Sequence, residues 1–236
     1  MMSEARQKRA GSPGRRNPDF FLDALSPEEV ALLHARGVVR RFPRGDALFH
    51  ERQLSDRVML LTEGRVKIAS TSADGRETVL AFRGPGEVLG ELSAIDGKPR
   101  SAGVTAVDPV VALVIPTRAF RAFLERSPRA SLWILERLIA RLREADRKRA
   151  EFGTSDTIGR VAARLVELAA DYGREQPGGG IRIDLPITQE ELASWVGSSR
   201  EGVNKALQTL KGLRWVETER RAITVLDMEA LRKRAT

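Results

Sequence analysis

Two short segments hold polar residues whose types and spacing could do chemistry. The first is Gly90-Glu91-Leu92-Ser93, followed after six residues by Arg100-Ser101-Ala102. Backbone N–H groups at a glycine turn can line an anion site, and Arg100 can form two parallel bonds to phosphate oxygens. Ser101 adds a hydroxyl donor, and an ionised Glu91 can accept a hydrogen bond from a ribose 2′-hydroxyl. The set suits a cyclic nucleotide, although a charged surface turn with a structural ion pair would show the same pattern.

The second segment has the spacing of two short helices joined by a turn. Thr188, with Glu191 three residues later, predicts a capping box at the start of the first helix, and Val196-Gly197 is the turn. The second helix then exposes a polar face that could meet base edges: Ser199, Arg200, Glu201, Asn204 and Lys205. Arginine can bond guanine in bidentate fashion, and glutamate can accept from cytosine. This favours a DNA-reading helix-turn-helix over an ordinary helical hairpin with solvated charges.

Further elements around this segment complete the expected DNA-binding unit. The periodicity predicts a helix over 157–171, a turn at 177–180, a strand over 181–185 and a β-pair around 214–225. This order is typical of a winged helix-turn-helix. The candidate DNA contacts also include Thr188 and Gln189 at the first helix and Arg220 at the tip of the wing, where the Arg220-Arg221 pair could equally be a solvated hairpin.

The elements that must position the first segment are short β-rich runs. The expected strands are Val58–Leu61, Arg65–Ser70, Thr78–Phe82 and Val110–Ile115. Glycine turns separate them, which predicts an antiparallel, jelly-roll-like β-roll. Before the strands, Ser26 as a cap and Pro27 in the first turn predict a helix start within 19–36.

A long helix is predicted from Pro128 onward. Leu135, Ile139 and Leu142 are spaced by four and three residues, and Leu132 and Leu138 broaden the stripe. The opposite face is expected to carry the charged residues Arg137, Arg141, Arg143 and Glu144. A charged helix with an apolar seam at this spacing can pair with a copy of itself. We favour that dimer over a helix laid on the sheet of its own domain.

Both segments carry a family resemblance. Val88-Leu89-Gly90-Glu91-Leu92-Ser93 with Arg100-Ser101-Ala102 resembles the phosphate-binding cassette of cyclic-nucleotide-binding domains. The C-terminal segment, with its Ser-Arg-Glu-x-Val core at 199–203, is similar to that of the bacterial cyclic-AMP receptor protein (Crp–Fnr) family. The resemblance covers the chain from about residue 19. One departure is Gly202, where the family pattern commonly has threonine.

The resemblance implies roles for individual residues. Gly90 and Glu91 would contact the ribose side of a cyclic nucleotide, and Arg100 and Ser101 would hold its phosphate. The remaining candidate ligand-binding residues of the cassette and the long helix are Leu92, Ser93, Ala102 and Arg141. The implied partners are double-stranded DNA with TGTGA-like half-sites, a second copy of the chain, and RNA polymerase.

The base of the nucleotide is left open by the sequence. Alignment through Phe152 and the segment 156–160 places the base-contacting pair of the family on Ala145 and Asp146. Ala145 cannot hydrogen-bond through its side chain. Asp146 can accept from the adenine amino group, but its two oxygens also match the adjacent N1–H and N2–H donors of guanine. Cyclic AMP comes first on family frequency, while cyclic GMP, cyclic di-GMP and DNA binding without an effector remain open.

Composition excludes several other classes of protein. Cysteine is absent and histidine occurs only as His34 and His50, which argues against disulfides, zinc–thiolate sites and multi-histidine metal centres. We therefore expect no metal, and no nucleophile–base or metal constellation of an enzyme such as a cupin is recognisable. The formal net charge of +8 concentrates in the first 16 residues and in 126–153. No apolar stretch of the kind that membrane spans or secretory leaders need is found, so a cytoplasmic protein is expected.

These observations combine into one prediction. The fold class is α+β, with four parts: a disordered basic tail (1–18), a cyclic-nucleotide-binding β-roll (19–125), a dimerisation helix and hinge (126–155) and a winged helix-turn-helix (156–236). The predicted function is a ligand-gated, sequence-specific regulator of transcription. A signalling adaptor whose helix-turn-helix binds a protein is the alternative from another class.

Overall fold

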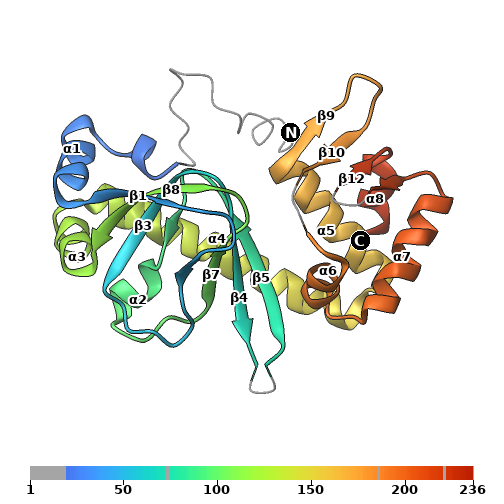
Figure 1. Ribbon diagram of the computed structural model, residues 1–236, viewed down its shortest axis with the longest axis horizontal. Coiled ribbons are helices and arrows are strands. Elements are labelled where there is room, and N and C mark those ends of the chain that lie inside the picture. The colour runs from blue at the N-terminus through green and yellow to red at the C-terminus, as the bar shows by residue number, and fades with distance from the viewer. Residues whose placement is uncertain (1–19, 73–74, 185–186, 220–221, 236) are drawn as a thin grey trace. The chain divides into compact units, whose positions relative to one another are not determined.

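The computed structural model describes residues 20–72, 75–184, 187–219 and 222–235. These residues form two compact units, 20–142 and 143–235, and the division falls inside helix α4 (Pro128–Thr154) (Figure 1). The predicted basic tail, 1–18, lies outside the described residues. Within the described parts, no helix is long and apolar enough to cross a membrane.

The N-terminal unit is built on two antiparallel sheets. One sheet has the strand order β1-β8-β3-β6 and the other the order β2-β7-β4-β5. The strands are β1 (Val38–Phe42), β2 (Ala47–Phe49), β3 (Arg57–Glu63), β4 (Val66–Thr71), β5 (Glu77–Arg83), β6 (Val88–Leu89), β7 (Gly103–Ala106) and β8 (Val110–Pro116). This architecture confirms the predicted β-roll. The four predicted strands correspond to β3, β4, β5 and β8, while β1, β2, β6 and β7 were not expected.

Strand β3 is apolar at successive positions because both of its faces are buried. Val58 and Leu60 belong to one core cluster, whereas Met59 and Leu61 belong to another. Successive side chains of a strand point to opposite faces, so a strand covered on both faces is apolar at every position. The same division holds for the neighbouring strand β8, where Leu113 lies in the first cluster and Ala112 in the second.

Four helices pack against strands β3, β6 and β8 of this unit through one shared core cluster. They are α1 (Pro27–Arg36), α2 (Glu91–Asp96), α3 (Thr117–Arg126) and the first part of α4. The predicted cap of α1 is confirmed as a capping box, in which Ser26 Oγ accepts from the N–H of Glu29 at 3.3 Å and the Glu29 carboxylate accepts from the N–H of Ser26 at 2.8 Å. A separate 3₁₀ turn, Leu22–Ala24, precedes it, and Phe21 packs edge-on against Trp133.

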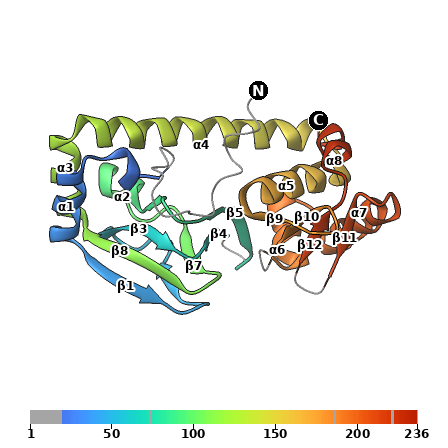
Figure 2. The ribbon, with the colours of Figure 1, turned by 90° about the horizontal axis from the view of Figure 1, so that it is seen from above.

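Helix α4, which Figure 2 draws as one continuous helix, has two apolar faces that differ in exposure. Ala130, Trp133 and Ile134 are buried in the core of the N-terminal unit, and Leu138 packs against them. A second face leaves a row of apolar residues exposed, which we call the α4 stripe: Leu132 at 55%, Leu135 at 52%, Ile139 at 40% and Leu142 at 62%. Leu138 therefore does not belong to the stripe, contrary to expectation, because it contributes to the core of its own unit.

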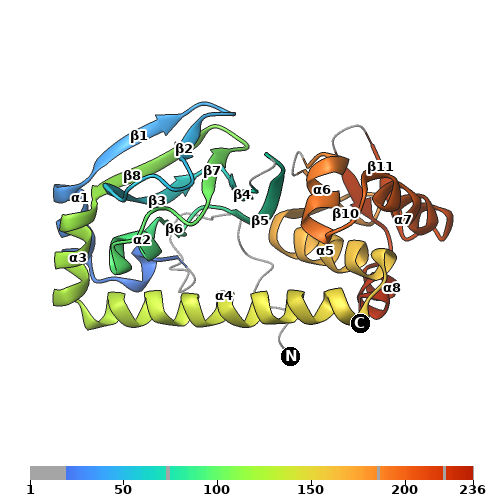
Figure 3. The same ribbon diagram turned by 90° about the horizontal axis from the view of Figure 1, so that it is seen from below.

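The C-terminal unit contains the predicted winged helix-turn-helix (Figure 3). Its elements are α5 (Thr157–Tyr172), β9 (Gly173–Glu175), β10 (Ile181–Ile183), α6 (Gln189–Val196), α7 (Arg200–Gly212), β11 (Val216–Thr218), β12 (Ile223–Val225) and α8 (Met228–Arg234). The strands form one antiparallel sheet in the order β11-β12-β10-β9. Strand β9 and helix α8 were not predicted, since each is short.

Candidate functional site

Gly90 joins strand β6 to helix α2 at the centre of the first candidate site. Its φ of 82° is left-handed, a conformation that glycine adopts without strain. A Cβ at this position would also lie 2.3 Å from Nη1 of Arg100 and 3.2 Å from the Phe49 ring. Backbone conformation and close approach therefore both require glycine. The sequence predicted a glycine turn here, and in the structure this turn is also the start of helix α2.

Arg100 is a buried cation, with 4% of its surface exposed. Its Nη1 donates to the carbonyl of Gly90 at 2.9 Å, its Nη2 donates to the carbonyl of Arg57, and its guanidinium lies 3.9 Å from the centre of the Phe49 ring. Among the described residues, the closest carboxylate is Asp56, 3.9 Å away and 57% exposed, and Nε has no hydrogen-bond partner.

These surroundings leave the charge of Arg100 incompletely compensated. Burial lowers the pKa of its guanidinium, and the charge of Asp56 only partly offsets this effect. An arginine remains protonated in proteins, so the buried charge needs an electrostatic partner. A phosphate supplies negative charge and acceptor oxygens in the geometry that a guanidinium binds best.

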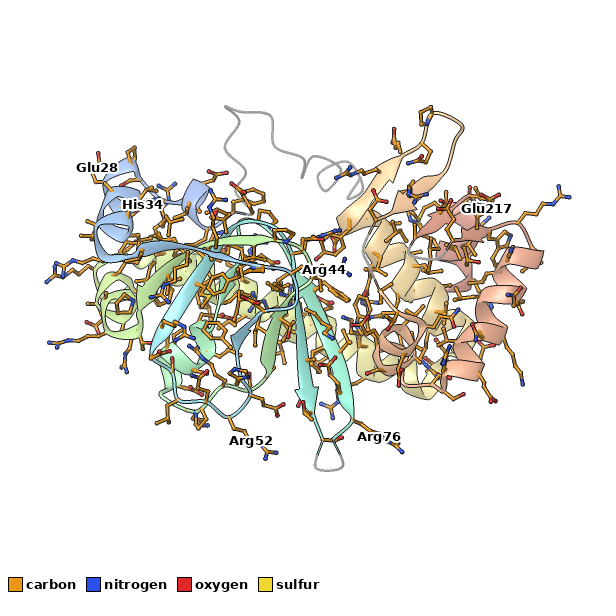
Figure 4. The ribbon with its side chains drawn as sticks, in the orientation of Figure 1. Glu28, His34, Arg44, Arg52, Arg76 and Glu217 are labelled. Carbon is orange, nitrogen blue, oxygen red and sulfur yellow. The ribbon has the colours of Figure 1, made fainter. Side chains whose placement is uncertain are left out.

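The backbone of Arg100 is fixed by the loop after β2. Its N–H donates to the carbonyl of Gln53 at 2.8 Å, and its carbonyl accepts from the N–H of Arg52 at 2.8 Å. Arg52 adopts a left-handed φ of 65°, and its side chain points away from the sheets (Figure 4). Sequence reasoning missed this loop. Its contacts are made by backbone atoms, which leave no signature in residue type.

Glu91 and Arg141 form the second part of the site. Glu91 is 4% exposed and accepts a hydrogen bond from Nη1 of Arg141. The other end of that guanidinium lies 3.9 Å from Glu87, which also pairs with Arg83 at 3.3 Å. Arg141 was expected on the charged face of α4 opposite the apolar seam. It instead approaches the β-roll, because a buried carboxylate needs a cationic partner.

The other predicted ligand residues of the cassette differ in exposure. Ser93 is buried and its hydroxyl donates to the carbonyl of Pro99 at 3.4 Å, while Ala102 is also buried. Ser101 and Leu92 are exposed. The structure thus brings Gly90, Glu91, Arg100 and Arg141 together through short contacts, and it places Leu92 in solvent.

Ala145 and Asp146 are exposed residues of α4 in the C-terminal unit. Asp146 follows Leu142 by four residues and so continues the spacing of the α4 stripe. Two arginines near it in the sequence pair with other carboxylates. Arg141 pairs with Glu91, and Arg147 pairs with Glu151 and Glu167. The Arg147–Glu151 pair has the spacing of neighbours on one helix, whereas the pairs with Glu91 and Glu167 join different elements and are not visible from that spacing.

The second candidate site is the pair α6 and α7. The predicted capping box is confirmed: Thr188 Oγ1 accepts from the N–H of Glu191 at 3.1 Å, and Glu191 accepts from the N–H of Thr188 at 2.8 Å. Gly197 ends α6 in a left-handed conformation with a φ of 61°. The two helices are held by buried apolar residues, which are Leu192, Ala193, Val196, Val203, Ala206, Leu207 and Leu210.

The polar residues of these helices lie largely as predicted. Exposed side chains are Thr188, Gln189, Ser199, Arg200, Glu201 and Lys205, whereas Asn204 is half-buried. Helix α7 begins at Arg200, because Ser199 is its N-cap and accepts from the N–H of Gly202 at 3.0 Å. Arg220, the expected wing contact, lies outside the described residues.

The histidines do not form a site. His34 is exposed on α1 (Figure 4) and His50 is exposed directly after β2. Within the described ranges, no group of three or more His, Cys, Asp or Glu residues is placed to hold a metal ion. Trp133 is buried, with the guanidinium of Arg137 5.1 Å from the centre of its ring, and Trp195 and Trp215 are half-buried.

The two parts of the chain that hold the candidate sites each match a known family. Residues 39–127 match the family model of the cyclic nucleotide-binding domain, and residues 159–234 match that of the Crp-like helix-turn-helix domain. The chain is 36% identical over 215 residues to the CRP-like cAMP-activated global transcriptional regulator of Mycobacterium tuberculosis, covering 91% of this chain and 96% of that protein.

Two further similarities extend the comparison. The cyclic AMP receptor protein of Thermus thermophilus is 32% identical over 186 residues, which cover 79% of this chain and 82% of that protein. The solved structure of the c-di-GMP-responsive global regulator CLP of Xanthomonas campestris has a TM-score of 0.74 at 22% identity, covering 85% of this chain and 99% of that one. At this identity the likeness concerns the fold.

Proposed function

The chain belongs to the cyclic-AMP receptor protein (Crp–Fnr) family of transcriptional regulators, and on this premise we propose that it is a cytoplasmic homodimer whose binding to specific DNA depends on cyclic AMP. The observation that carries the proposal is Arg100. It is 4% exposed, and its closest carboxylate among the described residues is 3.9 Å away. A cyclic phosphate would compensate this charge.

Cyclic AMP is the effector that we favour. The relatives from Mycobacterium tuberculosis and Thermus thermophilus, at 36% and 32% identity, are both named for cyclic AMP. A guanine nucleotide, either cyclic GMP or cyclic di-GMP, is the second candidate. Asp146 favours that alternative, because its carboxylate can accept two hydrogen bonds from the adjacent donors of guanine. DNA binding without any effector is the third.

The proposed signal starts at the contact between Glu91 and Arg141. A ribose 2′-hydroxyl that donates to Glu91 adds a partner to a carboxylate already bound by α4. The nucleotide would then act on the helix that carries the α4 stripe. It shifts an equilibrium between two arrangements of the regulator only to the extent that it binds one of them better.

The proposed output is recognition of a palindromic, TGTGA-like operator. Arg200 would bond a guanine, and Glu201 would accept from the cytosine on the opposite strand. Thr188, Gln189, Asn204, Lys205 and Arg220 would add contacts, and RNA polymerase would be the partner at the promoter. No enzymatic activity is proposed, since a regulator of this kind needs no catalytic group.

The experiment that tests the effector is calorimetric titration of the full chain with cyclic AMP, cyclic GMP and cyclic di-GMP. We expect cyclic AMP to bind most tightly and to increase affinity for the operator. Tighter binding of a guanine nucleotide would replace cyclic AMP by the second candidate. Failure of all three nucleotides to bind would contradict the proposed ligand site.

Asp146→Asn tests how the base is read. An amide keeps one acceptor but loses the paired acceptors, so the ranking of the nucleotides should change. It also removes the repulsion between the two copies of this carboxylate in the proposed dimer, so DNA binding without ligand should strengthen. Glu136→Gln removes a charge from another exposed position of α4 and serves as the control. If the Asp146 variant keeps both its nucleotide ranking and its ligand dependence, the base is read elsewhere.

A further inference from the structure

Gly202 lies in the first turn of α7, directly after the residues proposed to read bases. Its backbone is helical, so nothing in its conformation requires glycine. Glycine inside a helix costs about 1 kcal/mol relative to alanine. The recognition helix therefore carries an unfavourable residue at its most important end, and the reason must lie in the space around it.

That space is occupied by a hydroxyl group. A Cβ built on Gly202 would lie 2.6 Å from the Oγ of Ser198, far inside ordinary van der Waals contact. It would also lie 3.3 Å from the Oγ of Ser199 and 3.8 Å from the Cγ2 of Thr157. Gly202 thus faces both the turn before α7 and the first residue of α5.

Ser198 is held in this position from two sides. Its N–H donates to the carbonyl of Ala193 at 3.0 Å, which fixes its backbone to the end of α6. Its hydroxyl lies 3.3 Å from the hydroxyl of Thr157, the first residue of α5. Since neither serine nor threonine is exposed here, this hydroxyl pair connects the N-terminus of α5 to the turn that precedes α7.

We infer that Thr157, Ser198 and Gly202 act together as a positioning unit for the recognition helix. The inference rests on the proposed DNA-reading function of α7. The hydroxyl pair sets how the N-terminal turn of α7 sits on α5, and Gly202 is glycine because the Ser198 hydroxyl needs its space. None of the three is placed in contact with a base. They act through the orientation of Ser199, Arg200 and Glu201.

The inference makes the effect of a methyl group at 202 depend on residue 198. In the native background, Gly202→Ala favours the helix but displaces the Ser198 hydroxyl from Thr157. In a Ser198→Ala background the hydroxyl is gone, and the same methyl group meets no oxygen there. The two substitutions are therefore expected to be strongly non-additive, as contacting residues are.

A double-mutant cycle on the full-length protein tests this coupling. Affinity is measured by fluorescence anisotropy for a duplex with a TGTGA-like palindrome and for a scrambled duplex of equal composition. Both are measured without nucleotide and with saturating cyclic AMP, cyclic GMP or cyclic di-GMP, and the condition with the largest ratio for the native chain is used for the variants. Gly202→Ala should lower the ratio of the two affinities by about tenfold, the size of the loss expected when one base-reading side chain is misplaced. In the Ser198→Ala background it should lower the ratio by less than about twofold, as expected once the clash is removed.

Two further variants separate positioning from general stability. Thr157→Val removes one hydroxyl while keeping the shape, and should lower the same ratio about as much as Ser198→Ala. Gly212→Ala changes the last residue of the same helix, where a Cβ meets nothing within 4 Å, and should leave the ratio unchanged. Thermal unfolding of each variant shows whether a loss of the ratio merely follows a loss of stability.

Equal effects of Gly202→Ala in both backgrounds, or no effect in the native background, would overturn the inference. So would a ratio that falls only in proportion to the unfolding temperature. If the native chain binds both duplexes equally, the DNA-reading function fails and the positioning role fails with it. Specific binding without coupling between 198 and 202 leaves the proposed function standing and removes this inference alone.

Discussion

Arg100 is a buried cation without a close anionic partner among the described residues, and this indicates the kind of ligand that it could bind. Two carbonyls and an aromatic ring surround its guanidinium, and these dipoles compensate a positive charge less well than a carboxylate does. A buried cation normally pairs with an anion, because the cost of removing it from water is otherwise large. For Arg100 the closest carboxylate among the described residues is the exposed Asp56 at 3.9 Å, and Nε has no hydrogen-bond partner there.

The first prediction follows from this arrangement. Arg100→Ala should weaken cyclic-nucleotide binding by about 2 kcal/mol or more, since it removes charge-assisted bonds to phosphate. Arg100→Lys should recover only part of the loss, because an ammonium cannot reproduce the two parallel bonds. Calorimetry gives both values. Lys98→Ala, which removes an exposed charge two residues away, is the control. Unchanged affinity in a folded Arg100→Ala variant would remove this residue from the ligand site.

Arg200 carries the second prediction at this scale. It is exposed in the first turn of α7, where an arginine can reach O6 and N7 of guanine. Arg200→Ala should cost about 1–3 kcal/mol of specific affinity and relax the preference at one base pair. Selection from a random duplex library shows the altered motif. Arg220→Ala should instead lower affinity for all sequences alike. An unaltered motif in the Arg200 variant would mean that α7 does not read that base pair.

Helix α4 has different partners along its length. Its buried face completes the core of the β-roll through Trp133 and Ile134, and its contact with Glu91 comes from Arg141. The α4 stripe is a separate face, exposed between 40% and 62%. Four large apolar residues in a row at spacings of three and four are typical of a helix that pairs with another helix. We therefore place the proposed dimer contact on the stripe.

The third prediction tests that contact. Leu135→Asp should shift the protein from dimer to monomer, because burying a carboxylate in an apolar seam costs several kcal/mol. Sedimentation velocity measures the oligomeric state. Ala140→Asp adds the same charge at an exposed position of α4 outside the stripe and should leave the dimer intact. Dimers of equal stability in both variants would place the contact on another surface.

A network of ion pairs joins the C-terminal part of α4 to α5. Arg164 has a side chain only 3% exposed and contacts Glu151 at 2.5 Å and Glu167 at 2.9 Å. Arg147 reaches the same two carboxylates from α4. Trp195 of α6 lies under this group, 5.9 Å from the guanidinium of Arg164. One buried arginine thus links three helices of the DNA-binding unit.

The fourth prediction concerns this arginine. Arg164→Met should lower the free energy of unfolding by about 3 kcal/mol or more, since it leaves two carboxylates without their buried partner. Urea denaturation provides the measurement. Lys233→Met breaks an exposed pair with Glu229 and should change the free energy by less than about 0.5 kcal/mol. A small effect at Arg164 would mean that Arg147 and Lys148 together satisfy both carboxylates.

For the whole molecule, the fifth prediction concerns the geometry of the DNA site. A dimer with two-fold symmetry should protect a palindrome whose half-site centres are separated by about one helical turn, roughly 34 Å. Footprinting on a selected operator gives the spacing. Protection should require nucleotide and should be lost at a single half-site. Full protection of an isolated half-site would argue that one chain binds DNA alone.

The sequence allowed much of the architecture to be predicted, for identifiable physical reasons. Continuous apolar runs marked strands covered on both faces, as in β3, and the caps at Ser26 and Thr188 marked helix starts. Arg100 and Glu91 were identified by their spacing around Gly90 and by the resemblance of that segment to a phosphate-binding cassette, and their contact with a ligand stays a prediction. Such signals depend on residues close together in the sequence, so they can be recognised without knowledge of the fold.

What the sequence could not show depends on contacts between distant segments. Arg141 meets Glu91 fifty positions away, and Ser198 meets Thr157 forty-one positions away. Strand β1 consists of exposed or half-exposed residues and so lacks a hydrophobic pattern. The loop that holds Arg100 acts through backbone atoms alone. In each case the decisive partner is supplied by the fold, and residue type near the position carries no trace of it.

The α4 stripe also has a consequence for inheritance. In a dimer joined through the stripe, a chain with a damaged α7 still pairs with an intact one, and the mixed dimer reads only half of a palindrome. At equal expression of the two alleles, random pairing leaves about a quarter of the dimers fully intact, by mass action. Lesions of α7 should therefore be dominant in a cell carrying both alleles, and a second lesion at Leu135 should make them recessive.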